Sequence, residues 1–172
     1  HYARGRLTVR ERIDQLLDDD TFHETGEITG KVSYDENGEI KEFVPANFVF
    51  GRGKLDGREV VVAGDDFTVR GGAADARIGN KSLYSLKLAE HLRLPLVNLV
   101  DGSGGGGSVK TLETMGATYV PGLPSWQNIV RLLSMVPVVG ACMGSVAGLG
   151  SARVVASHFS IMVKGSAQMF VA

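Results

Sequence analysis

The chain has 172 residues, the length of one ordinary domain. Its 18 Lys and Arg nearly balance its 19 Asp and Glu, which excludes a protein held on nucleic acid by a broad basic field. Hydrophobic residues make up 44% and charged residues 22%, which excludes overall disorder. Glycine is the outlier, with 23 residues, about twice its average share. This excess predicts several places where the backbone approaches another group closely or adopts a positive φ.

The N-terminal segment predicts a helix followed by a hairpin. Thr8 starts the helix, because Glu11 three residues later completes a capping box. The polar stretch 26–41 contains Asn37-Gly38, a dipeptide typical of a tight hairpin turn. We assign residues 1–45 to an N-terminal extension of the main domain.

The remaining residues, 46–172, alternate between apolar strands and helices. Strands are predicted at 48–55, 59–64, 95–100, 136–142, 159–163 and 169–172, and helices at 78–92, 125–135 and 149–157. This order predicts parallel strands with right-handed crossovers, an α/β fold. The uncharged stretch 132–152 could cross a bilayer by length, but its Gly and Pro residues favour strand, turn and helix. The last strand runs to Ala172 without a polar cap, so we expect a piece of something longer.

Two glycine-rich loops follow predicted strands. Residues 102–107 satisfy G-x-G-x-x-G, but no acidic residue follows at the distance that ribose recognition requires. Lys110-Thr111 lacks the preceding glycine of a Walker loop, so nucleotide binding is disfavoured. In the second loop, 144–151, backbone N–H groups could hold a developing oxyanion. Small residues there could also serve tight strand–helix packing, which the spacing alone favours.

No side-chain constellation suggests a nucleophile or a metal. Cys142 lies in an apolar strand and is expected to be a small buried hydrophobe, without an intrachain disulfide. No two of the four histidines have helical ligand spacing, and neither Ser145 nor Ser151 lies in G-x-S-x-G. His158 is expected to be a satisfied residue at a strand edge. We therefore predict chemistry carried by backbone donors and no metal site.

Five segments, in order, carry a family resemblance. They are HYARGRLTVRERI at 1–13, DFTVRGGA at 66–73, DGSGG at 101–105, MGSVAGLG at 143–150, and FSIMV with MFVA at 159–163 and 169–172. Together they resemble the carboxyltransferase (β) subunits of biotin-dependent acyl-CoA carboxylases, such as propionyl-CoA and methylcrotonyl-CoA carboxylase. The resemblance covers nearly the whole chain.

The resemblance implies a crotonase-like (ClpP-type) ββα superhelix, with this chain as the N-terminal half of a two-domain carboxyltransferase. The substrate would be an acyl-CoA and the cofactor biotin, as carboxybiotin on a separate carrier domain. CO₂ would reach the α-carbon, or a vinylogous γ-carbon, through a thioester enolate. Implied partners are a biotin carboxylase or carrier subunit and further copies, in a dimer-based oligomer expected to be a hexamer. The implied location is the cytoplasm or the mitochondrial matrix, with no nucleic acid and no membrane span.

The resemblance also assigns site residues one by one. It places the oxyanion hole for the enolate at Gly148, Leu149 and Gly150. The residues matched to the surroundings of bound CoA are Arg70, Gly71, Gly72, Ala73, Arg77 and Lys81. The three charged ones among them could also be ordinary solvated side chains. Those matched to the loop beside the acyl pocket are Gly104, Gly105 and Gly106.

Two departures from the family pattern leave alternatives open. Leu149 stands where glycine is usual, and the arginine that often follows D-S-G-G-A is missing. The altered loop suggests a substrate other than propionyl-CoA, or a divergent member. A biotin-dependent decarboxylase subunit and a non-catalytic, CoA-binding scaffold are the alternative functions. If the oxyanion hole exists, the amides around residue 149 should have no protein partner.

Overall fold

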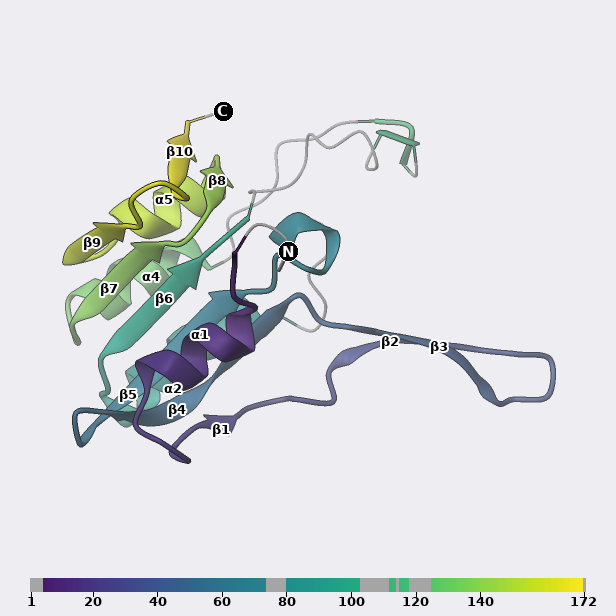
Figure 1. Cartoon of the computed structure of the whole chain (residues 1–172), viewed down its shortest axis with the longest axis horizontal. Coiled ribbons are helices and arrows are strands. Elements are labelled where there is room, and N and C mark those ends of the chain that lie inside the picture. The colour runs from purple at the N-terminus through teal and green to yellow at the C-terminus, as the bar shows by residue number, and fades with distance from the viewer. Residues whose placement is uncertain (1–4, 74–79, 103–111, 114, 118–124, 172) are drawn as a thin grey trace.

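The computed structural model describes residues 5–73, 80–102, 112–113, 115–117 and 125–171 (Figure 1). Its centre is a six-stranded sheet in the order β1-β4-β5-β6-β7-β9. These strands are β1 (His23–Glu24), β4 (Phe48–Leu55), β5 (Arg58–Asp65), β6 (Leu96–Val100), β7 (Val138–Cys142) and β9 (Phe159–Met162). β1, β4 and β5 pair antiparallel, whereas β5, β6, β7 and β9 pair in parallel. The predicted α/β class with parallel strands is confirmed.

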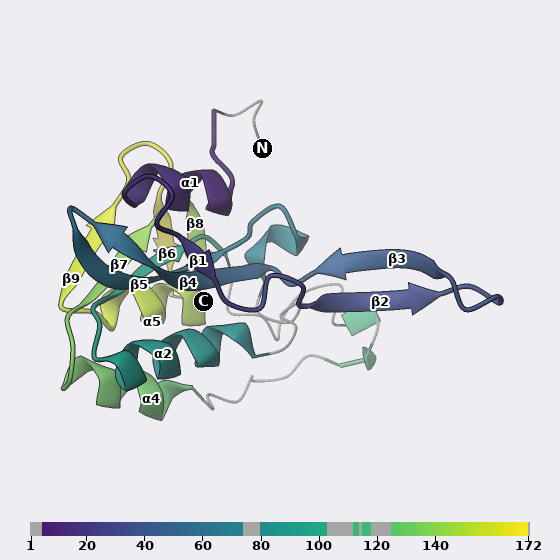
Figure 2. The same cartoon turned by 90° about the horizontal axis from the view of Figure 1, so that it is seen from below.

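Helices cover both faces of this sheet (Figure 2). α2 (Lys81–Leu92), α4 (Trp126–Leu133) and α5 (Leu149–Val155) lie on one face, and α1 (Val9–Leu16) lies on the other. Gly140 of β7 lets α5 approach the sheet, because a Cβ there would lie 2.5 Å from the carbonyl oxygen of Val154. With both faces covered, the central strands must be apolar in both directions, which explains their unbroken hydrophobic runs.

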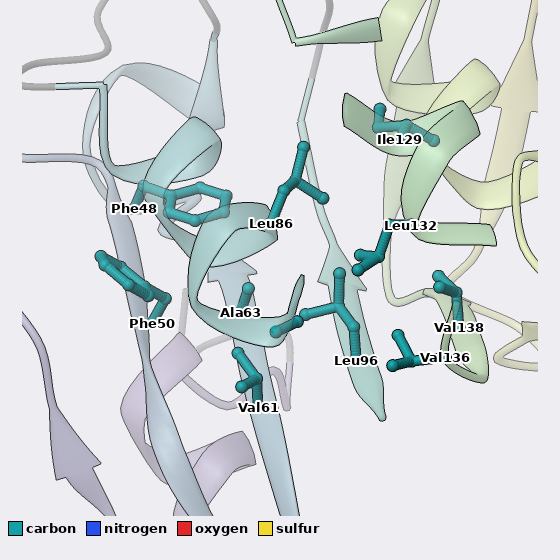
Figure 3. Close-up of a cluster of buried hydrophobic side chains, with 11 residues drawn as sticks. Phe48, Phe50, Val61, Ala63, Leu86, Leu96, Ile129, Leu132, Val136 and Val138 are labelled. Atoms are coloured by element: carbon teal, nitrogen blue, oxygen red, sulfur yellow. The ribbon is translucent and has the colours of Figure 1, made fainter. Parts of the chain in front are cut away.

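Two of the three hydrophobic clusters in the described residues fill the two layers. The larger lies between the sheet and helices α2 and α4 (Figure 3). Its residues are Phe48, Phe50, Val61, Ala63, Leu86, Ala89, Leu96, Ile129, Leu132, Val136 and Val138. The cluster under α1 contains Val9, Ile13, Leu17, Val49, Val60, Val62, Val97, Leu99 and Ala141. Successive residues of β4 and β5 enter opposite clusters, as the two-residue period of a strand requires.

α1 begins as predicted and also carries a buried charge. The Glu11 N–H donates to Thr8 Oγ1 at 3.3 Å, and the Thr8 N–H donates to Glu11 Oε2 at 2.7 Å. Arg12 lies on the buried face of the helix, and its Nη1 donates to Asp101 Oδ2 at 2.7 Å. Burial raises the pKa of Asp101 above its ordinary value, although the neighbouring Arg12 guanidinium opposes the rise. This ion pair fastens α1 to the end of β6.

The smaller elements lie outside the six-stranded sheet. β2 (Gly30–Tyr34) and β3 (Ile40–Pro45) form the predicted hairpin, which projects from the body (Figures 1 and 2). β8 (Ser145–Ala147) pairs in parallel with β10 (Gln168–Phe170), where the sequence predicted only a turn after β7. Val146 of β8 is fully buried, and this burial anchors the short strand against the body of the protein. α1 and β1 pack in the main body, so the division at residue 45 stays a prediction.

Burial on α4 gives a test of the core. Leu132 is 1% exposed, whereas Val130 on the same helix is 56% exposed. Leu132→Ala should lower the free energy of unfolding by about 2–5 kcal/mol, because it leaves a cavity under the helix. Val130→Ala is the matched control and should change it by about 0.5 kcal/mol or less. Urea denaturation measures both values, and equal losses would contradict the burial.

The pKa of Asp101 makes a second prediction, about stability and pH. A carboxyl whose pKa is raised by folding favours the folded state most at low pH. That contribution falls as the pH rises from the ordinary value of 3.8 through the raised pKa, and is constant above it. Asp101→Asn removes this titration. Between about pH 4 and pH 7, urea denaturation should therefore show wild type losing stability relative to the variant. A difference independent of pH would contradict this.

Candidate functional site

Three glycine-bearing turns follow the parallel strands β5, β6 and β7. β5 leads to η2 (Arg70–Gly72), a 3-10 turn, β6 leads to Gly102, and β7 leads through β8 to the turn Gly148–Gly150. Because these strands are parallel, their carboxyl ends meet at one edge of the sheet, where α/β proteins bind ligands. The predicted CoA segment and the predicted oxyanion turn therefore belong to the same edge.

Main-chain contacts hold these turns together. A Cβ on Gly72, whose φ is 66°, would lie 2.3 Å from the carbonyl oxygen of Asp101. A Cβ on Gly102 would lie 2.5 Å from the Gly72 oxygen, and one on Gly150 would lie 2.5 Å from the Gly102 oxygen. No side chain fits at any of the three positions without displacing backbone. We call Gly72, Gly102 and Gly150 the glycine stack.

The amides of the predicted oxyanion turn differ in their partners. The Gly148 N–H donates to the carbonyl oxygen of Phe170 at 3.1 Å, so the prediction of a free donor there is wrong. Gly148 instead supplies a φ of 55° at the turn. Within the described parts of the chain, no acceptor bonds the N–H of Leu149 or Gly150. The N–H groups of these two residues, of which Leu149 is half-buried and Gly150 buried, are the candidate donors.

The predicted CoA segment lies on one side of the glycine stack. Gly71 and Gly72 both have a positive φ, which shapes the turn after β5. The Asn47 side chain fixes the end of this turn, because its Nδ2 donates to the Ala73 carbonyl at 2.8 Å. Arg70 is exposed at the start of the turn.

Of the other predicted contacts, Lys81 differs from the prediction, and the rest cannot be placed. Lys81 is buried rather than solvated: its Nζ lies 3.1 Å from Glu24 Oε1, and both side chains are 6% exposed. Glu24 also pairs with Arg10, so one carboxylate is shared by two cations, and the Lys81 side chain is buried against it. Arg77 and the loop Gly104–Gly106 lie outside the described residues.

A buried set of four charges beneath the site was missed by sequence reasoning. Asp65 ends β5, and its carboxylate pairs with Arg153. Asp101 directly follows β6, and its carboxylate pairs with Arg12. The available signal for Arg12 was its place three residues after Val9, on the apolar face of α1. For the two aspartates the signal was their position at the carboxyl ends of buried strands.

Two predicted structural residues have the expected environments. Cys142 is buried, its Sγ lies 3.3 Å from the Gly144 carbonyl oxygen, and burial raises the pKa of its thiol. A thiol that resists ionisation is a poor nucleophile. His158 Nδ1 accepts the Val138 N–H at 3.0 Å, so it is a satisfied strand-edge residue. The described residues contain no cluster of three metal-ligating side chains, and no described helix is long and apolar enough to cross a membrane.

Comparison with known proteins gives one consistent family. Residues 1–172 match the family model described as the carboxyl transferase domain. The chain is 31% identical to the biotin-dependent acetyl-/propionyl-coenzyme A carboxylase beta5 subunit of Mycobacterium tuberculosis. It is 29% identical to the methylmalonyl-CoA decarboxylase subunit alpha of Veillonella parvula. These alignments cover 99% of this chain but 30% and 32% of the two relatives, so the chain spans about a third of their length.

Solved structures agree with the sequence relatives. The beta subunit of Pseudomonas aeruginosa geranyl-CoA carboxylase has a TM-score of 0.75 at 25% identity, covering 99% of this chain and 31% of that one. The transcarboxylase 12S hexamer with hydrolysed methylmalonyl-coenzyme A has a TM-score of 0.72 at 27% identity, covering 99% and 32%. These neighbours confirm the crotonase-like architecture expected from the sequence. Because the family model matches this chain over residues 1–172, the chain belongs to the carboxyl transferase domain family.

Proposed function

We propose that this chain is the acyl-CoA-binding, N-terminal half of the carboxyltransferase component of a biotin-dependent acyl-CoA carboxylase. The observation that carries the proposal is the family match over residues 1–172. Within that match, two amides without a described acceptor fall in the segment that corresponds to the family's oxyanion hole. The reaction would place a carboxyl group on the α-carbon of an acyl-CoA, or on the vinylogous γ-carbon of a conjugated acyl chain.

The chain's own contribution to the chemistry is to hold negative charge. Loss of the α-proton moves charge onto the thioester oxygen, and the N–H groups of Leu149 and Gly150 are the proposed donors to it. In a protease, one such donor contributes about 3–4 kcal/mol to the transition state. The glycine stack holds Gly150 against Gly102, so the turn needs little reorganisation when charge develops. A thioester carbonyl therefore fits the donors that this turn offers.

The CoA portion is proposed to lie along Arg70–Ala73, on the η2 side of the glycine stack. Small residues there let a ligand approach the backbone closely. Arg70 and Arg77 remain the proposed contacts for CoA phosphates. Lys81 is not among them, because its side chain is buried against Glu24.

The remaining parts of the proposal concern groups that reach this chain from elsewhere. Carboxybiotin, when brought by its carrier domain, supplies both the CO₂ and the base for the α-proton. The loop Gly104–Gly106 is proposed to border the acyl chain. A biotin carboxylase or carrier subunit and further copies of the chain, in a dimer-based assembly such as a hexamer, are the proposed partners. The cytoplasm or the mitochondrial matrix is the proposed location.

A decarboxylase subunit is the second candidate, favoured by the relative from Veillonella parvula that is 29% identical. Transfer in either direction passes through the same enolate, so Leu149 and Gly150 would keep their roles. Incubating the full-length protein with its carrier and either acyl-CoA plus carboxybiotin or a malonyl-type CoA plus biotin measures transfer in each direction. Transfer in neither direction by a correctly assembled protein would favour a non-catalytic scaffold.

The amide of Leu149 can be removed with little change to the turn. Proline is tolerated at the first position of a helix, so Leu149→Pro deletes the N–H where α5 begins. We expect kcat for carboxyl transfer to fall about 10²–10³-fold, with the KM for acyl-CoA nearly unchanged. Leu149→Ala keeps the N–H and removes the side chain, so its kcat should stay within about threefold of wild type.

Steady-state assays over acetyl-, propionyl-, methylcrotonyl- and long-chain CoA esters check this and define the substrate. Equal kcat values in the two Leu149 variants would count against the amide as a donor. A change of acyl-chain preference in Leu149→Ala alone would assign the leucine side chain to specificity.

A further inference from the structure

Asp65 joins three elements beneath the glycine stack. It is the last residue of β5, and its side chain is 1% exposed. Arg153 Nη1 donates to both carboxylate oxygens, at 2.9 Å and 3.0 Å. The Asp101 N–H donates to Oδ2 at 3.2 Å. One buried carboxylate therefore ties β5 to the end of β6 and to α5.

Arg153 connects Asp65 to the helix α5, which begins with the amides proposed to stabilise the oxyanion. It lies four residues after Leu149 on α5, so the two residues share one face of the helix. The Arg153 side chain is 12% exposed, and its guanidinium lies 5.5 Å from the centre of the Phe48 ring. A guanidinium held by two oxygens and an aromatic ring fixes both the rotation and the position of the helix that follows the turn.

The same carboxylate reaches the turn by a second route. Asp101 is followed by Gly102, whose carbonyl oxygen contacts Gly150 in the glycine stack. The bond from the Asp101 N–H to Asp65 therefore sets the backbone on one side of Gly150, while Arg153 sets the helix on the other. Both routes converge on Gly150.

We propose that Asp65 and Arg153 form a positioning pair for carboxyl transfer. The pair sets where the amides of Leu149 and Gly150 stand relative to the thioester oxygen, and it touches neither substrate nor cofactor. This inference depends on the proposed function. Misplacing reacting groups by about 1 Å can cost about 100-fold in rate, so a small shift of the turn is enough. Replacing both members of a buried pair by well-packed apolar residues is often neutral for stability, whereas removing one member alone is destabilising, so the test must separate kcat from stability.

The test uses the full-length protein with its biotin carrier, and variants that remove the Asp65–Arg153 contact fully or in part. Arg153→Met removes it, and kcat should fall at least about 30-fold while the KM for acyl-CoA stays within about threefold. Arg153→Lys keeps the charge but loses the planar guanidinium that lies 5.5 Å from the centre of the Phe48 ring, so kcat should fall by about 3- to 10-fold. Adding Asp65→Asn to Arg153→Met should lower kcat little further, because the Arg153 contact is already gone and the asparagine oxygen can still accept the Asp101 N–H.

Arg131→Met is the matched control, because it breaks an arginine–carboxylate pair to Glu90 on the outer side of α4, with Arg131 68% exposed. Its kcat should equal that of wild type. A lowered melting temperature with wild-type kcat in folded Arg153→Met would overturn the inference and leave a purely structural pair. If Arg153→Met does not fold, Arg153→Lys decides, and wild-type kcat there overturns the inference equally. A wild type without transfer activity would instead refute the proposed function.

Discussion

Contact between three stretches of main chain is the constraint on which the candidate site depends. The parallel strands β5, β6 and β7 end at one edge of the sheet, so the turns after them must share a small space. At Gly72, Gly102 and Gly150 that space is filled by backbone alone, since a Cβ at any of them would overlap a carbonyl oxygen. The contact couples η2 to the turn Gly148–Gly150. A displacement of one turn is therefore transmitted directly to the others.

Buried charges support this edge from below. Arg12 pairs with Asp101 and Arg153 pairs with Asp65, which gives two cations and two carboxylates with no net charge. Burying such pairs costs desolvation energy that their mutual attraction offsets only when the geometry is good. Their contribution here is to orient the elements that they join. Arg12 brings in α1 from the opposite face of the sheet, so elements on both faces are fastened to the strand ends where the turns meet.

The candidate site separates what a motif can predict from what it cannot. The matched segments assigned site roles to Gly72 and to the turn around Leu149, and these assignments stay predictions. They could not reveal that the Gly148 N–H is already bonded to Phe170, a residue on another strand. The sequence also predicted a Lys81 that meets CoA or solvent, whereas its partner is Glu24, 57 positions earlier in the chain. Whether a donor or a charge is available depends on distant neighbours.

The sequence by itself determined the local elements and the family. The capping box of Thr8 and the turn at Asn37-Gly38 could be predicted, because they follow from local backbone preferences, and the apolar runs follow from burial periodicity. Tertiary structure alone decided the short pairing of β8 with β10 and the ion pair of Arg12 with Asp101, residues 89 positions apart. The electrostatic free energy of a buried charge depends on the partner that folding brings beside it and on the hydration that folding removes. Neither is encoded in the neighbouring residues.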